Sequence, residues 1–127
     1  DPPAEFSEAA FLNRLATDSG CGLLLDLYNL ECNAHNQGWA AADFLAELDL
    51  APVRELHLAG GTEHRGLMLD IHSRLTRDST RQLLPEVLAR APGVEAVIYE
   101  IMPEALPVLG HQAWADEVER LDRLMAA

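Results

Sequence analysis

The sequence predicts an α/β protein in which about three parallel strands alternate with helices, as part of a (β/α) TIM barrel. Residues 23–27, 53–59 and 94–101 are short apolar segments, and the patterns between them are helical. Strands that are apolar on both faces are typical of parallel sheets covered by helices. The chain has no G-x-G-x-x-G or G-x-x-x-x-G-K motif, which disfavours a small open nucleotide-binding sheet.

The length predicts one incomplete unit over residues 1–127. Hydrophobic residues make up 49% of the chain, which is enough for a real core. A complete TIM barrel needs about 250 residues, so three strands amount to less than half of one. The chain begins Asp1-Pro2-Pro3 without a methionine, and we expect a processed product or a piece of a longer protein.

The first third of the chain predicts a helix, a strand and a loop. Residues 8–17 place their apolar side chains on one helical stripe, and Ser7 is a suitable N-cap. Gly20 ends this helix, and the strand at 23–27 follows. The asparagines and the glycine of residues 33–38 predict a loop.

The remaining segments continue the alternation of helices and strands. A short helix at 41–48 precedes the strand at 53–59, and a long connection leads to a brief extended piece at 67–72. The next helix covers 78–91, with Pro85 in its first turns or at a kink. After the strand at 94–101, a final helix is predicted from apolar residues spaced at helical intervals: Trp114, Val118, Leu121 and Met125.

Charge and composition exclude several classes of partner. The formal net charge is -12, from 21 acidic and nine basic residues, which disfavours nucleic acid and anionic lipid as partners. No apolar stretch approaches the roughly 20 residues of a membrane helix, and no leader opens the chain, so a cytoplasmic location is the default. Cys21 and Cys32 are expected to be buried or half-buried thiols rather than a disulfide framework.

Polar residues stand at the ends of the predicted strands. Asp26 and Asn29 close the first strand, His57 lies in the second, and Glu100 ends the third. The carboxyl ends of barrel strands form one rim, where such enzymes hold their reactive groups. A lone charge in an apolar strand costs several kcal/mol unless it is paired or bound to a cation. We therefore expect these side chains to share a cation.

Asp70 and His72 add a D-x-H pair after the second strand. Two residues of extended chain would place both side chains on the same side, where they can chelate. Carboxylates, imidazoles and an amide oxygen suit Fe, Mn or Zn, and two or more ions are possible with this many ligands. Each residue also has a structural alternative, such as a cap, a core histidine, a turn residue or a salt bridge, and their shared position favours the metal.

Other polar residues are weaker candidates. His35 and Asn36, in the predicted loop near the same rim, are candidate substrate-binding residues, although a surface histidine is the alternative. His64 and His111 are weaker still. The sequence has no spacing typical of a Ser/His/Asp or Cys/His nucleophile and no CxxC or HExxH motif.

Several motifs together resemble the multinuclear non-haem iron-dependent oxidases, a family that includes the methanobactin biosynthesis oxidase. The motifs are GLLLDLYNL at 22–30, NAHNQG at 33–38, ELHLAG at 55–60, LDIH at 69–72 and YE at 99–100. They occur in the family's order and at about its spacing, from roughly Phe6 to the end of the chain. The resemblance implies the carboxy-terminal half of a xylose-isomerase-like TIM barrel.

The resemblance also implies a site and a function. The implied iron ligands are Asp26, Asn29, His57, Asp70, His72 and Glu100. The family binds two or three irons, uses dioxygen to oxidise cysteines in ribosomally made precursor peptides, and often works with a small partner protein that holds the peptide leader. Without the family's amino-terminal strands, the chain is expected to bind fewer or no irons, and to self-associate or to bind its missing half.

Some residues depart from the family's pattern. Gly61 stands where a second histidine is common, with His64 as a possible substitute, and Arg74 stands where another histidine is frequent. Ile101-Met102 replaces the usual Trp-Asp. Two other functions therefore stay open: a sugar-isomerase-like metal enzyme on the same barrel, and a non-catalytic remnant that acts as a binding or assembly module.

Overall fold

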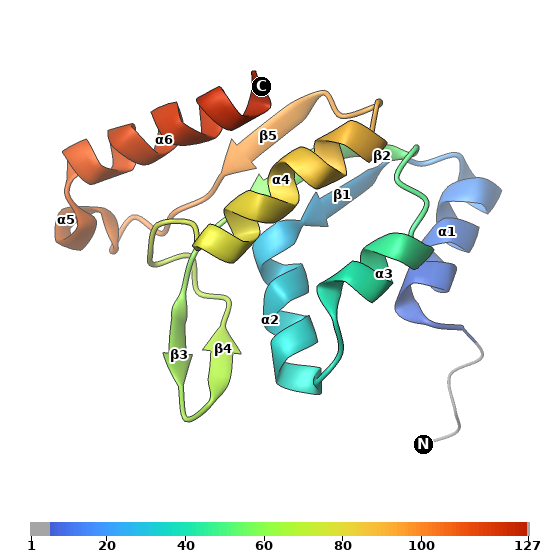
Figure 1. Cartoon of the computed structure of the whole chain (residues 1–127), viewed down its shortest axis with the longest axis horizontal. Helices are drawn as coiled ribbons and strands as arrows, with labels where there is room; N and C mark the ends of the chain where they lie inside the picture. The colour runs from blue at the N-terminus through green and yellow to red at the C-terminus, as the bar shows by residue number, and fades with distance from the viewer. Residues whose placement is uncertain (1–5, 127) are drawn as a thin grey trace.

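The computed structural model of the chain describes residues 6–126, and Figure 1 shows its helices and strands in order. The elements are α1 (Glu8–Ser19), β1 (Leu23–Asp26), α2 (Leu27–Gln37), α3 (Ala41–Glu47), β2 (Val53–Leu58), β3 (Thr62–His64), β4 (Leu67–Leu69), α4 (Asp78–Arg90), β5 (Ala96–Tyr99), α5 (Leu106–Leu109) and α6 (His111–Met125). The predicted α/β class is confirmed. No helix within residues 6–126 is long and apolar enough to cross a membrane.

Three parallel strands form the central sheet, in the order β1-β2-β5. Asp26 pairs with His57, and His57 pairs with Ile98, so the carboxyl ends of all three strands lie at one edge of the sheet. The predicted parallel sheet is confirmed, and its helix-strand alternation is consistent with part of a barrel. The strands β3 and β4 form a separate antiparallel hairpin.

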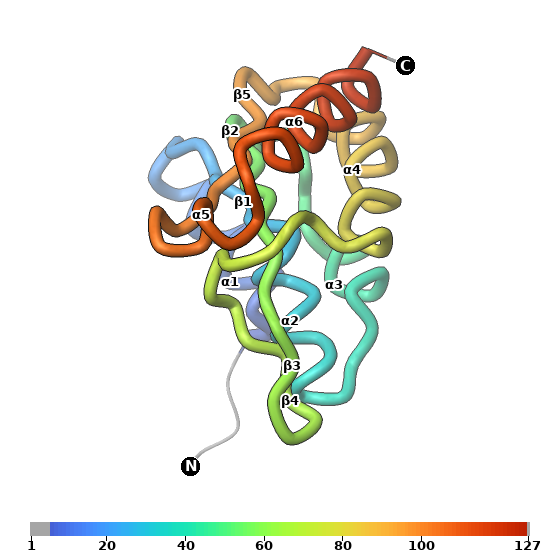
Figure 2. The backbone as a smooth tube through the Cα atoms, turned by 90° about the vertical axis from the view of Figure 1, so that its left-hand side faces the viewer, coloured from blue at the N-terminus to red at the C-terminus, as the bar shows by residue number. Residues whose placement is uncertain are grey.

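The two faces of the central sheet differ in their cover. Figure 2 shows α3, α4 and α6 on one side of the sheet, and this side holds a core that includes Leu25, Leu56 and Leu58. On the other face, Leu24 and Ile98 keep 54% and 38% of their surface exposed. Because side chains alternate along a strand, this second face also carries Asp26 and His57.

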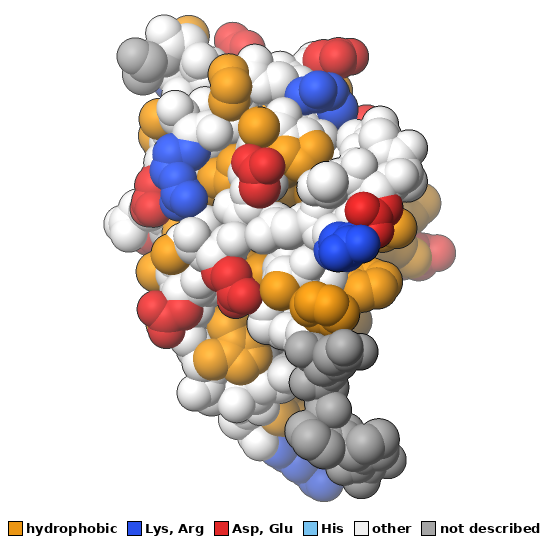
Figure 3. Space-filling view, turned by 90° about the vertical axis from the view of Figure 1, so that its right-hand side faces the viewer, with side chains coloured by type: hydrophobic (Ala, Val, Ile, Leu, Met, Phe, Trp, Pro, Cys, Tyr) orange, Lys and Arg blue, Asp and Glu red, His pale blue; other side chains and the backbone are white. Residues whose placement is uncertain are grey.

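The surface over α1 and α3 carries both hydrophobic and charged side chains (Figure 3). Figure 3 shows hydrophobic side chains there in several separate groups, with acidic and basic side chains between them. Phe11 and Leu15 on α1 are among the exposed large hydrophobic residues.

The start of α1 follows the prediction, because the Ser7 side chain accepts a hydrogen bond from the Ala10 N–H, and Gly20 ends the helix at a φ of 71°.

The predicted loop at residues 33–38 is wrong, since α2 runs through it to Gln37. Asp26 caps this helix by accepting a hydrogen bond from the Asn29 N–H, and Gly38, with a φ of 76°, ends it. Buried side chains recur at helical intervals along α2: Leu27, Tyr28, Leu30, Cys32 and Ala34. Burial of this face outweighs the turn preference of the asparagines, and Asn29 belongs to the first turn of α2.

The segment after β2 also differs from the prediction. A hairpin replaces the long connection, and its tip, Arg65-Gly66, has positive φ at both residues, as in a two-residue turn that matches strand twist. The extended piece ends at Leu69, and His72 adopts a left-handed φ of 48°. Cys32 is buried as expected, whereas Cys21 is exposed and lies in the short segment between α1 and β1.

Candidate metal centre

The predicted ligands meet at the carboxyl edge of the sheet. Asp26 is the last residue of β1, His57 lies near the end of β2, and Glu100 directly follows β5. The connection after β4 brings Asp70 and His72 to the same edge. The topology of the parallel sheet therefore places side chains that are up to 74 positions apart in the sequence within one cluster.

Glu100 stands at the centre of this cluster. Its Oε1 lies 3.3 Å from His57 Nδ1, and its Oε2 lies 3.2 Å from His72 Nδ1. One ligand atom each from Asp26, His72 and Glu100 lie within 4.8 Å of one another. Each oxygen of this one carboxylate thus faces a different imidazole. Such a carboxylate can bind one cation or bridge two cations.

The position of His72 depends on its backbone. A left-handed φ is uncommon for a residue other than glycine and is frequent at functional sites. The His72 carbonyl accepts a hydrogen bond of 2.8 Å from the Met102 N–H, and the Gly60 carbonyl accepts hydrogen bonds from Ser73 and Arg74. These bonds tie the connection to the ends of β2 and β5, so the imidazole is held beside Glu100.

Asn29 contacts the cluster through hydrogen bonds. Its Nδ2 donates to Asp70 Oδ2 at 2.9 Å, and its Oδ1 accepts from Asn33 Nδ2 at 2.9 Å. Its backbone N–H donates to Asp26 Oδ1 at 2.8 Å. In this arrangement the amide holds Asp70, and metal ligation through Oδ1 would require Asn33 to release it.

The cluster concentrates negative charge in a partly buried place. Burial raises the pKa of Asp26 above its usual range, the Asn29 N–H opposes this rise, and the nearby Asp70 charge adds to it. Asp70 Oδ1 is buried without a hydrogen-bond partner, and its contact with His72 Nε2 at 3.0 Å is an ion-pair approach only. A buried oxygen without a partner and a desolvated carboxylate both fit a bound cation, and the set of oxygens and imidazoles suits Fe, Mn or Zn.

Glu55 is a neighbour of the cluster that the sequence interpretation missed. Its Oε1 lies 2.6 Å from His57 Nε2, and the two residues are two positions apart on β2. Side chains at i and i+2 of a strand share a face, so the E-x-H spacing was the signal that could have found it.

His35 and Asn36, the predicted substrate-binding residues, lie against the β3–β4 hairpin. Asn36 accepts a hydrogen bond from the Met68 N–H and donates to the Met68 carbonyl, at 2.8 and 2.9 Å. His35 Nε2 lies 3.0 Å from the Gly66 carbonyl. These bonds fasten the hairpin to α2, and a contact with substrate stays a prediction for both residues.

The position of Gly61 has no room for a side chain. A Cβ atom there would collide with the Leu69 carbonyl oxygen and the Tyr28 hydroxyl. The second histidine of the resemblance therefore cannot be restored here while the hairpin stays in place. His64 lies on the exposed strand β3, outside the triad of Asp26, His72 and Glu100.

Fold and site together define the class of this protein: an α/β chain that gathers carboxylates and imidazoles at the carboxyl ends of parallel strands. Its family follows from comparison with known proteins. The chain belongs to the family described as RiPP precursor modification enzyme MbnB/TglH/ChrH, whose model matches residues 2–125. The resemblance seen in the sequence is thereby confirmed at the level of the family.

Curated relatives carry the name UPF0276 protein. RB0508 of Rhizobium meliloti (strain 1021) is 33% identical over 118 residues, which cover 88% of this chain and 38% of the relative. A protein of Chromobacterium violaceum is 38% identical over 89 residues, covering 70% of this chain and 32% of the relative. A protein of Paraburkholderia phytofirmans is 36% identical over 113 residues, covering 84% and 37%. The chain therefore spans about a third of the length of the curated relatives it matches.

Proposed function

We propose that this chain carries part of the iron site of an enzyme that oxidatively modifies cysteine in ribosomally made precursor peptides. The observation that carries the proposal is Glu100, whose two carboxylate oxygens each face a different imidazole, His57 and His72. The family description supports the peptide as substrate. A sugar-isomerase-like reaction has no comparable support, because the matching family modifies peptides.

The residues that would hold iron are those of the cluster. Asp26, His72 and Glu100 would bind one ion, and His57 on the other oxygen of Glu100 offers a place for a second. Asn29 would keep Asp70 turned towards the site through its hydrogen bond. Bound iron would supply the redox chemistry, with dioxygen as the oxidant, while these side chains set the number and position of the ligands.

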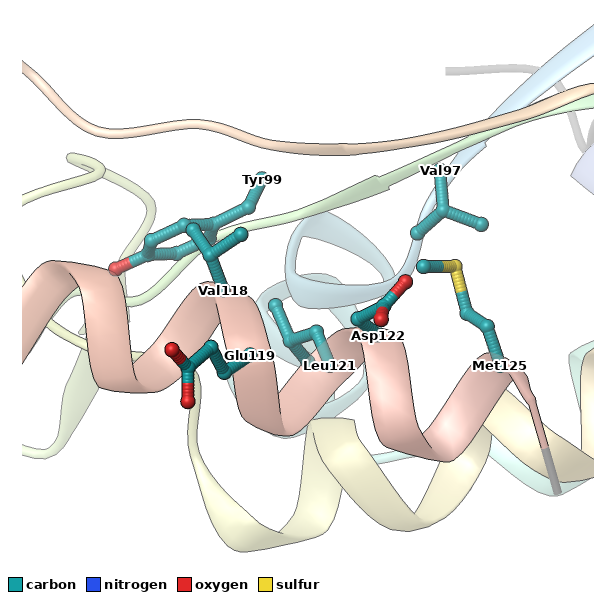
Figure 4. A pocket seen from close by; sticks show the side chains of 7 residues that line it. All are labelled: Val97, Tyr99, Val118, Glu119, Leu121, Asp122 and Met125. Carbon is teal, nitrogen blue, oxygen red and sulfur yellow. The ribbon is translucent and has the colours of Figure 1, made fainter.

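The sheet face that carries Asp26 and His57, called the inner face below, is exposed in the described part of the chain, and we propose that a further (β/α) segment covers it. The chain spans about a third of its curated relatives, and in the described part of the chain β1 and β5 each pair with one strand only. A pocket of about 410 Å³ lies between β5 and α6. Figure 4 shows its lining, in which Glu119 and Asp122 accompany apolar side chains such as Val97, Leu121 and Met125. Apolar side chains of an added strand could pack against the apolar part of this lining.

A segment with the remaining strands explains these features better than a second copy. Two copies would bring two sets of Asp26, Glu55 and Glu100 together, and each copy has a net charge of -12. A precursor peptide would reach the cluster at the carboxyl edge of the sheet, which an added segment would leave open and where Glu100 keeps part of its surface exposed. A small partner protein that holds the peptide leader belongs to the same proposal.

Metal analysis tests this function directly. The chain is loaded with ferrous iron without oxygen, freed of excess metal, and analysed for iron content and for mass in solution. The Asp26→Asn/His57→Ala double variant removes two ligands, and Asn keeps the N-cap of α2. The matched control is Asp18→Asn/His64→Ala, which changes one exposed acid and one exposed histidine outside the cluster.

We expect about one or more irons per chain in the parent and the control, and less than a tenth of that in the double variant. Iron-loaded parent should then consume oxygen with a cysteine-containing precursor peptide once the missing segment is supplied. If the parent binds no iron, or if the double variant binds as much as the control, the proposed iron site is wrong. The non-catalytic module would then be the better explanation.

A further inference from the structure

Glu55 and His57 form a close pair on the inner face of β2. The Glu55 Oε1 lies 2.6 Å from His57 Nε2, and the imidazole is only 15% exposed. Within residues 6–126, His57 is the one ion-pair partner of Glu55. In the strand register Glu55 lies beside Leu24 and Ala96, one step before the level of Asp26 and His57. Glu55 therefore supports the imidazole from the amino side of the cluster.

The two nitrogens of His57 have different partners. Nε2 faces Glu55 at 2.6 Å, and Nδ1 faces Glu100 Oε1 at 3.3 Å. A neutral imidazole carries a hydrogen on one nitrogen and a lone pair on the other. Hydrogen bonds from a nitrogen to a carboxylate are short, so the shorter contact places the hydrogen on Nε2. Nδ1 then carries the lone pair and lies 3.3 Å from Glu100 Oε1.

We propose that Glu55 is a positioning residue, which fixes the Nε2–H form of His57 and turns Nδ1 towards the metal ions. The inference rests on the proposed metal site. Histidines that bind metals usually donate their second ring N–H to a carboxylate or carbonyl, which fixes the tautomer and the ring orientation. Glu55 itself is not in the ligand position, because the imidazole lies between its carboxylate and Glu100.

Two variants separate hydrogen bonding from charge. Glu55→Gln keeps an oxygen that can accept the Nε2 hydrogen, whereas Glu55→Ala removes it. Glu63→Ala is the matched control, because Glu63 is an exposed glutamate on the hairpin. Chemical unfolding of all four proteins is measured first, and similar midpoints show that the variants fold.

The first readout is the histidine tautomer, measured by ¹⁵N NMR of the metal-free protein at about pH 8, where an ordinary imidazole is neutral. We expect His57 in the Nε2–H form in the parent, Glu55→Gln and Glu63→Ala, and a mixture of both forms in Glu55→Ala. A parent that shows mainly the Nδ1–H form, or a Glu55→Ala protein with the parent's spectrum, would overturn the inference.

The second readout is the affinity for Co²⁺, used as a visible probe. Glu55→Ala should bind about 10- to 100-fold more weakly than the parent, and Glu55→Gln should stay within about threefold of it. Equal affinity in Glu55→Ala and the parent would overturn the role towards metal. If the parent binds no Co²⁺, the proposed metal site fails, and the NMR result still decides whether Glu55 orients His57.

Discussion

An ion pair between Arg81 and the buried Glu117 joins α4 to α6. The Glu117 side chain is 1% exposed, and its Oε1 accepts a hydrogen bond of 2.9 Å from Arg81 Nη1. Arg81 also donates to the Thr76 carbonyl and pairs with Asp78. Thr76 belongs to the connection that leads away from His72, so one guanidinium holds both the last helix and this connection.

The two halves of the pair should differ in their effect on stability. Arg81→Met leaves a buried carboxylate without its cation, a change that costs about 3–5 kcal/mol. Arg120, 3.9 Å from Glu117 and half exposed, compensates in part, so we expect about 3 kcal/mol. Glu117→Gln leaves Arg81 with Thr76 and Asp78, and should cost about 1–2 kcal/mol. Arg81→Met/Glu117→Leu should lie within about 1 kcal/mol of the parent, because two apolar side chains leave no buried charge.

Urea unfolding followed by circular dichroism gives these free energies at constant pH and salt. Arg123→Met is the control, because Arg123 forms an exposed pair with Glu119 at 3.8 Å, and it should change stability by less than about 0.5 kcal/mol. An Arg81→Met protein within about 1 kcal/mol of the parent would refute the reasoning, as would a double variant less stable than Arg81→Met.

Two further predictions concern single positions. Iodoacetamide at about pH 8 should label the exposed Cys21 and spare Cys32. Burial raises the pKa of Cys32 to about 11, so its reactive thiolate forms only as the pH approaches that value. Mass spectrometry of the peptides measures the labelling, and equal labelling of both thiols would contradict the prediction. Gly61→His should lower the unfolding midpoint without adding metal affinity, because its side chain would collide with Leu69 and Tyr28. The control Gly66→Asn, at the hairpin tip, should have only a small effect on the midpoint. Tighter metal binding by Gly61→His would contradict the prediction and show that the hairpin moves to make room.

Much of the fold could be predicted because its strands are short apolar segments between helical patterns. The exception, α2, shows where turn preferences mislead. Asn33 and Asn36 suggested a loop, yet Leu27, Leu30 and Ala34 have helical spacing and are buried. Periodicity over residues 27–37 was the stronger signal, since packing of an apolar face decides helix stability more than the propensity of single residues.

The site was predictable to the extent that topology decides it. Asp26, His57 and Glu100 follow or end parallel strands, and such ends meet at one edge whatever the loops do. Asp70 and His72 lie beside the cluster as predicted, but the predicted extended backbone is wrong. His72 reaches Glu100 through a left-handed backbone conformation instead. Long-range hydrogen bonds set that conformation, and no local pattern encodes them.

The charges of the cluster bear on the choice between a working site and a structural remnant. Within residues 6–126 no arginine pairs with Asp26, Asp70 or Glu100, since the arginine ion pairs involve other carboxylates. The basic neighbours of these carboxylates are His57 and His72, which are charged only when protonated. The clustered, partly buried carboxylates therefore oppose folding, and burial raises the pKa of Asp26. The N-cap hydrogen bond from Asn29 offsets part of this cost for Asp26, and a bound divalent cation would offset the rest. The arrangement therefore supports the proposed metal site over the non-catalytic alternative.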